Sequence, residues 1–92
     1  MDRNSAETTA LKALGWLAAQ DDLFATFLSA SGASLADVRR QAGEPAFLAA
    51  VLAFLMQNDA WVLDFATANA IRPEAVAQAL ALLGGPAAMN WA

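Results

Sequence analysis

Residues 45–58 read PAFLAAVLAFLMQN and contain no charged side chain. A proline at the first helical position loses no intrahelical hydrogen bond and already has a helical φ angle, so we expect a helix to start at Pro45. A helix that is apolar on every side is normally buried. We therefore predict a central helix at about residues 45–57. Its expected core side chains are Phe47, Leu48, Val51, Leu52, Phe54 and Leu55.

Capping signals divide the chain before this central helix. Residues 4–7, Asn-Ser-Ala-Glu, match a capping box, which predicts that the first helix begins near Ser5. Asp21 and Asp22 follow it, and aspartate is a good N-cap because its carboxylate accepts hydrogen bonds from the free amides that start a helix. Gly32 is expected to end this second helix, since glycine tolerates the left-handed backbone found at many helix ends.

A short third helix is predicted next. Residues 34–37, Ser-Leu-Ala-Asp, match a second capping box. Asp37 and Arg40 are expected to face outward as an ordinary i, i+3 pair of small energetic value. The side chains expected to face the core are Leu35, Val38 and Ala42.

The second half of the chain resembles the first. A shift of 38 positions aligns residues 13–43 with residues 51–81, and this window contains six identical pairs: Leu14/Leu52, Leu17/Leu55, Asp21/Asp59, Phe27/Phe65, Ala30/Ala68 and Val38/Val76. The start of a helix at Asn58-Asp59 and a last helix after Arg72-Pro73-Glu74 fall in register with the first half. A structural repeat is the favoured interpretation, and two similar helical hairpins that arose by coincidence are the alternative.

The length and these patterns define the expected fold. Ninety-two residues suit one compact domain. We predict a single all-α domain over residues 1–92, a bundle of five or six short helices in which two similar helical units surround the central helix. The ordered core is expected at about residues 5–85, with flexible tails at 1–4 and 86–92.

Composition excludes several classes of function. The chain has no histidine, cysteine or tyrosine, so the side chains that most often serve as nucleophiles, general bases or metal ligands are missing. We therefore predict no enzyme activity, no cofactor and no metal. A net charge of −4 with five scattered cations disfavours nucleic acid as a partner. The hydrophobic fraction of 59% is high and favours an exposed partner face.

Localisation is also predicted from the sequence. The longest apolar stretch, residues 46–56, falls well short of the ~20 residues that span a bilayer. The polar N-terminus does not match a signal peptide. We expect a cytoplasmic protein with no membrane span.

Several segments carry a resemblance to a known family: Leu14-Gly15-Trp16-Leu17-Ala18, Asp21-Asp22, Phe27-Leu28, Ser31-Gly32, Asp37-Val38-Arg39 and, most specifically, residues 42–48, Ala-Gly-Glu-Pro-Ala-Phe-Leu. Through them the chain, from about residue 6 to residue 85, resembles a small family of alphaproteobacterial proteins classed as a domain of unknown function. The resemblance implies a short helical protein of the bacterial cytoplasm. It carries over no activity, ligand or catalytic residue.

Two specific sites are alternatives to a plain helical scaffold. If the two units pack symmetrically, Asp21, Asp22 and Asp59 would meet as a carboxylate or hard-cation site, although helix capping already explains Asp21 and Asp59. Residues 24–42 match the outline of a helix-turn-helix, in which the helix at 34–42 would present Arg39 and Arg40 to DNA. Leu28 stands where that motif usually has a small residue.

The favoured function is a non-catalytic interaction or structural module that binds a protein partner or a second copy of itself. Trp16 and Trp61 have the spacing of core residues, whereas Trp91 lies beyond the last predicted helix. Tryptophan and arginine are enriched at protein interfaces. The candidate interaction residues are therefore Arg39, Arg40 and Trp91.

Overall fold

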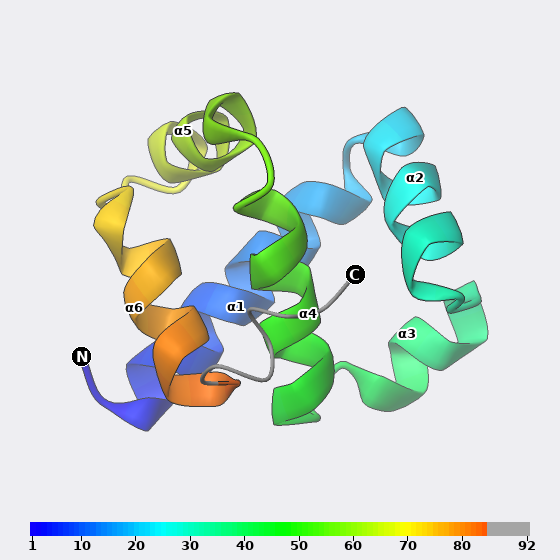
Figure 1. Cartoon of the computed structure of the whole chain (residues 1–92), viewed down its shortest axis with the longest axis horizontal. Helices are drawn as coiled ribbons and strands as arrows, with labels where there is room; N and C mark the ends of the chain where they lie inside the picture. The colour runs from blue at the N-terminus through cyan, green and yellow to red at the C-terminus, as the bar shows by residue number, and fades with distance from the viewer. Residues whose placement is uncertain (85–92) are drawn as a thin grey trace.

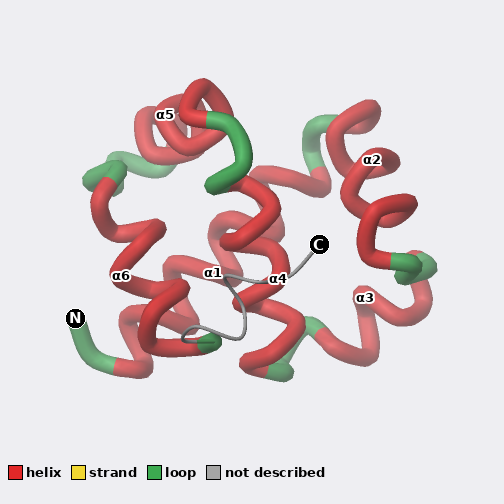
Figure 2. The backbone as a smooth tube through the Cα atoms, viewed as in Figure 1, coloured by secondary structure: helices red, strands yellow, loops and turns green. Residues whose placement is uncertain are grey.

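The computed structural model describes residues 1–84, and this part of the chain consists of six α-helices without a β-strand (Figures 1 and 2). The helices are α1 (Arg3–Ala18), α2 (Asp21–Ser31), α3 (Leu35–Gln41), α4 (Pro45–Leu55), α5 (Asp59–Ala68) and α6 (Glu74–Leu83). The predicted all-α bundle of five or six short helices is confirmed.

The helices are arranged around a crossing of α1 and α4. In Figure 1, α2 and α3 lie on one side of this crossing, and α5 and α6 lie on the other. The most extensive packing is between α1 and α6, followed by α1 with α4 and α4 with α6. The core is therefore shared by both halves of the chain.

The central helix α4 is as buried as its sequence predicts. It starts with Pro45 in the first turn, after the N-cap Glu44. The six predicted core side chains are each 7% exposed or less: Phe47, Leu48, Val51, Leu52, Phe54 and Leu55. Full burial of one such side chain contributes about 1.5–3 kcal/mol to folding. This helix is the largest single apolar contribution to the core.

The first helix begins earlier than the capping box at residues 4–7 predicted. α1 starts at Arg3, and the Asp2 carboxylate accepts a hydrogen bond from the Ser5 amide, with an Oδ1–N distance of 2.7 Å. Asp2 is itself a strong N-cap residue, and its negative charge suits the positive end of the helix. Asn4 therefore lies inside the helix, and the prediction of a start near Ser5 was wrong by two residues.

The equivalent starts of α2 and α5 also differ from the predicted capping. Asp21 is the first helical residue rather than the N-cap, a position that Gln20 occupies without a side-chain hydrogen bond. In α5 the cap is Asn58, whose Oδ1 accepts from the Ala60 amide at 2.9 Å, and Asp59 follows as the first residue. Asp21 and Asp59 thus keep equivalent places beside the positive ends of their helices.

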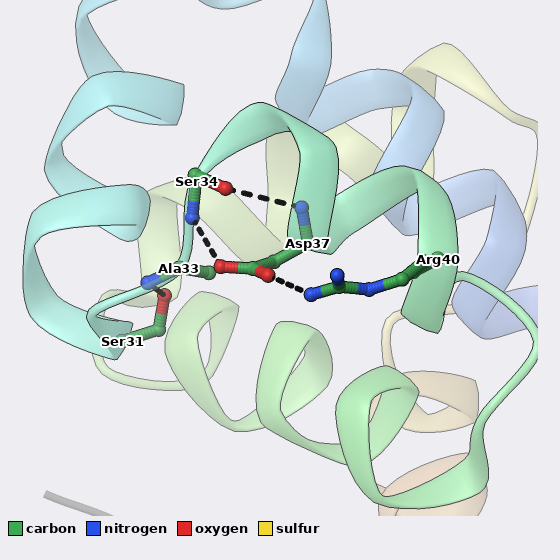
Figure 3. A network of polar contacts seen from close by, with 5 residues as sticks. All are labelled: Ser31, Ala33, Ser34, Asp37 and Arg40. Atoms are coloured by element: carbon green, nitrogen blue, oxygen red, sulfur yellow. Dashed lines mark hydrogen bonds and ion pairs between the residues drawn. The ribbon is translucent and has the colours of Figure 1, made fainter.

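The third helix has the predicted capping box. The Ser34 hydroxyl accepts from the Asp37 amide at 3.2 Å, while the Ser34 amide donates to the Asp37 carboxylate at 2.9 Å (Figure 3). Val38 is buried, but Leu35 is 51% exposed, so the prediction that it faces the core was wrong. Helical side chains lean toward the N-terminus, which directs a first-turn side chain past the end of its own helix.

Left-handed backbone occurs at the same place in both halves. Gly32 has a φ of 72° and closes α2, as predicted. The residue 38 positions later, Ala70, has a φ of 52° and is the one non-glycine residue with positive φ within residues 1–84. The Ile71 amide donates a hydrogen bond to the Ala66 carbonyl, and the Ala70 amide donates one to the Thr67 carbonyl. Together these bonds form a Schellman motif at the end of α5.

The two halves also exchange aromatic contacts. Trp16 of the first half meets Phe65 of the second edge-to-face, with ring centroids 6.2 Å apart. The residues related to them by the shift of 38 are Phe54 and Phe27, which meet in the same manner at 5.3 Å. Each half thus inserts an aromatic ring from its first helix against the second helix of the other half. The predicted repeat is visible in the packing as well as in the sequence.

Candidate functional site

An open pocket of about 610 Å³ lies between the end of α1, the start of α2 and the first half of α5. Its volume falls within the range of ~300–1,000 Å³ that is usual for ligand pockets. The residues that line it are Trp16, Gln20, Asp21, Asp22, Leu23, Thr26, Trp61 and Asp64. Both halves of the chain contribute to this pocket.

Two tryptophans form the aromatic walls of the pocket. Trp16 lies in the last turn of α1 and Trp61 in the first turn of α5, and both are half-buried. Trp16 packs against Phe65, and Trp61 stacks on Phe54 with ring centroids 5.1 Å apart. Since Phe54 and Phe65 belong to the core, each indole is anchored on its buried side while another part of the ring faces the pocket.

The charged groups of the pocket are all carboxylates. Asp21 and Asp22 come from the first turn of α2, and Asp64 comes from the middle of α5. All three are exposed, and among residues 1–84 no lysine or arginine lines the pocket. The positive end of α2 offsets part of the charge on Asp21 and Asp22. Asp64 lies in the middle of α5, away from both ends of its own helix.

The pocket contains two pairs of residues that are equivalent in the repeat. Leu23 corresponds to Trp61, and Thr26 corresponds to Asp64, each pair being 38 positions apart. The pocket therefore lies where the same faces of α2 and α5 approach each other. At the first position the second half has an indole, which can stack on a ligand, where the first half has an isobutyl group. At the second position it has a charged carboxylate where the first half has a neutral hydroxyl.

The predicted interaction residues lie outside this pocket. Arg39 and Arg40 are exposed on α3, and Arg40 forms an ion pair with Asp37 (Figure 3). Trp91, the third predicted residue, lies outside the described residues. The structure does not bring Arg39 or Arg40 together with the pocket.

The predicted carboxylate group is only partly assembled. Asp21 and Asp22 meet in the pocket, but Asp64 rather than Asp59 completes its lining. Within residues 1–84, no group of three histidine, cysteine, aspartate or glutamate residues is placed to hold a metal ion. Asp59 is the first residue of α5, in agreement with the prediction that it lies at a helix start.

Hydrogen bonds at the starts of two helices lower the pKa of a carboxyl group, Asp37 in the capping box of α3 and Asp2 at the N-cap of α1. The Ser34 amide and hydroxyl hydrogen-bond to Asp37, and with a smaller contribution from Arg40 they lower the pKa of Asp37 below 3.8. Hydrogen bonds from Ser5 likewise lower the pKa of Asp2. Neither residue lies in the pocket, so the shifts report local capping rather than chemistry at the site.

The segment predicted as a helix-turn-helix contains two helices, α2 and α3, joined by a short turn. α2 and α3 flank the left-handed Gly32, and Val38 is buried. However, α3 is seven residues long, and one of its two arginines is engaged with Asp37. The outline therefore exposes little positive charge to a nucleic acid.

The helical spacing predicts Trp16 and Trp61 as core residues, and Asp64 is not among the predicted site residues. The tryptophans do pack on the core, but their outer parts form the pocket. The sequence repeat does indicate Trp61 and Asp64 as unusual positions. Their equivalents in the first half are Leu23 and Thr26, so the two halves differ in side-chain chemistry at both places.

Among the helices of residues 1–84, none is by itself both long and apolar enough to cross a membrane.

Comparison with known proteins identifies the family but no function. No curated protein and no solved structure matches this chain. A family model described as "Protein of unknown function (DUF3572)" matches residues 3–86, which include all six helices. The chain therefore belongs to the DUF3572 family.

Proposed function

We propose that this chain is a non-catalytic protein-interaction module and that the pocket between α1, α2 and α5 is its binding site. One observation carries the proposal: two tryptophans anchored on core phenylalanines keep part of their rings open to a pocket at the junction of the two halves. Tryptophan is among the residues most enriched in the energetically dominant parts of interfaces.

The chemistry of the chain favours binding over catalysis. With no histidine, cysteine or tyrosine in the sequence, the groups available for acid–base or nucleophilic work are carboxylates, hydroxyls and one lysine. The three pocket carboxylates are exposed to solvent. An anchored aromatic wall with fixed charges is suited to holding a ligand.

DNA binding through α3 has weaker support. The net charge of −4 opposes a polyanion, and the ion pair between Asp37 and Arg40 reduces the positive charge that α3 presents. We therefore favour a protein partner.

The proposal is tested by affinity capture from the native cell with three forms of the full chain. They are the natural sequence, Trp61→Leu, and Leu63→Ala as a control on the same helix. Leu63 is 53% exposed and does not line the pocket. We expect the same partner to be retained by the natural chain and by Leu63→Ala and to be lost from Trp61→Leu.

Two results would change the assignment. Equal retention by all three forms would remove the pocket as the binding site. If sedimentation shows that the natural chain self-associates and Trp61→Leu does not, the partner is a second copy of the chain. Circular dichroism of each form verifies that the helical fold is intact.

A further inference from the structure

We propose that the pocket recognises an arginine side chain presented by the partner, an inference that rests on the pocket being the site of the proposed function. Its lining combines two half-buried indoles with three carboxylates. Aromatic faces and carboxylates share one ligand preference, because both attract a cation.

The tryptophans supply the surface on which a guanidinium can stack. Tryptophan is the strongest cation–π partner among the side chains, and arginine is the cation that most often stacks on it. The contacts of Trp16 with Phe65 and of Trp61 with Phe54 fix both indoles before a ligand arrives. Binding then costs little side-chain entropy on this side of the interface.

The carboxylates supply the charge and the hydrogen-bond acceptors. Asp64 contributes from α5, and Asp21 and Asp22 contribute from α2. A planar guanidinium has five N–H donors and can bind a carboxylate through two parallel hydrogen bonds while it stacks on a ring. A lysine ammonium provides a point charge without this planar match.

The size of the pocket also argues for an organic cation. About 610 Å³ is far larger than a bare metal ion requires, and residues 1–84 offer no three-residue metal cluster. The volume lies within the range of about 300–1,000 Å³ that is usual for pockets that bind organic ligands.

The repeat shows which residues create the preference. The first half has Leu23 and Thr26 where the second half has Trp61 and Asp64, and all four line the pocket. Replacing Trp61 with leucine removes the indole, and replacing Asp64 with threonine removes the carboxylate. In each case the new side chain is the one that the first half carries at the equivalent position. Trp61→Leu and Asp64→Thr are the decisive variants.

The test uses the full-length ¹⁵N-labelled protein and synthetic peptides. The three tryptophan indole N–H signals are assigned by single replacements with phenylalanine, and the chain is titrated with acetyl-Gly-Arg-Gly-Arg-Gly-amide. Matched peptides carry citrulline, which has the shape of arginine without its charge, or lysine. We expect the arginine peptide to shift the Trp16 and Trp61 signals, the lysine peptide to bind more weakly, and the citrulline peptide to have no effect.

The variants separate specific recognition from general attraction. Asp64→Thr should weaken binding of the arginine peptide by up to about fivefold, the upper value for one exposed ion pair. Asp59→Asn removes the same charge from the same helix but outside the pocket, so it should leave binding unchanged. Salt at about 1 M, where the screening length is about 3 Å, should weaken binding by the natural chain.

The outcomes distinguish this inference from the proposed function. Three results would overturn arginine recognition. The citrulline peptide could bind as tightly as the arginine peptide, Asp64→Thr and Asp59→Asn could weaken binding equally, or the arginine peptide could leave both indole signals unshifted. If a cellular partner nevertheless depends on Trp61, the interaction module stands with an uncharged ligand. If arginine binds but no partner depends on Trp61, the proposed function fails and the cation site remains.

Discussion

Ala70 adopts a left-handed backbone that alanine disfavours. Its φ is 52°, whereas the equivalent position in the first half is Gly32. The Cβ atom makes this conformation cost about 1–2 kcal/mol, and glycine avoids that cost but loses about 0.5–1 kcal/mol through its freer unfolded chain. Ala70 is exposed, so its methyl group contributes little packing.

We therefore expect Ala70→Gly to raise the free energy of unfolding by about 0.5–1 kcal/mol. In a domain of this size, each kcal/mol moves the melting temperature by about 4–8 °C. Urea denaturation followed by circular dichroism measures the change. The reciprocal control is Gly32→Ala, which should be destabilising by about 1 kcal/mol.

The control isolates the backbone effect. A Cβ atom added at Gly32 would meet no other atom within 4 Å, so the expected loss comes from φ alone and not from a clash. A Gly32→Ala variant as stable as the natural chain, or an Ala70→Gly variant that is less stable, would contradict the account.

At the scale of an element, α3 combines a capping box with little buried surface. It is seven residues long and has Val38 as its one buried side chain among the described residues. A helix this short does not persist alone in water. The reciprocal hydrogen bonds between Ser34 and Asp37 therefore add to the stability that the buried Val38 provides.

The pKa of Asp37 gives this cap a predictable pH dependence. Because hydrogen bonding lowers that pKa below 3.8 in the folded chain, the contribution of the carboxylate is fully present above pH 3.8. It is lost as the pH falls through the lower, folded value. We expect Asp37→Asn to flatten the stability profile in this acid range, as measured by urea denaturation at a series of pH values.

Asp59→Asn is the matched control for this measurement. Asp59 also lies in the first turn of a helix but is no partner in a capping box. Its replacement should leave the acid slope closer to that of the natural chain. Equal slopes in Asp37→Asn and the natural chain would contradict the assigned role.

The elements illustrate what the sequence could and could not predict. The stretch at residues 45–58 identified α4 and its buried side chains, because a helix that is apolar on every side favours a buried position and this one is too short to span a bilayer. The start of α1 was missed because Asp2 and Asn4 are both good N-cap residues, and the local pattern at residues 4–7 favoured Asn4. Leu35 was misplaced because periodicity ignores which way a first-turn side chain leans.

The pocket belongs to the scale of the whole molecule. Trp16, Asp22 and Asp64 lie on three different helices, and no local sequence pattern predicts that they line one pocket. Their proximity depends on how the helices pack. The sequence could indicate that Trp61 and Asp64 depart from their first-half equivalents. It could not show that both departures face one space.

The shared core predicts that neither half folds alone. α1 packs on α4 and α6, which both belong to the second half of the chain. We expect separate peptides of residues 1–43 and 44–92 to be largely unstructured by circular dichroism, since helices of this length are marginal without tertiary contacts. Mixing the two peptides should restore the helical signal. Full helicity of either peptide alone would contradict a shared core.

The exchange of aromatic contacts between the halves has a consequence for assembly. Trp16 contacts Phe65, and Phe54 contacts Phe27. Either contact could also form between residues of two different molecules. The connection between the halves is the short segment of residues 42–44. If shortening this hinge prevents the halves from folding back on each other, the same contacts can form between two molecules, and the chain then becomes a domain-swapped dimer.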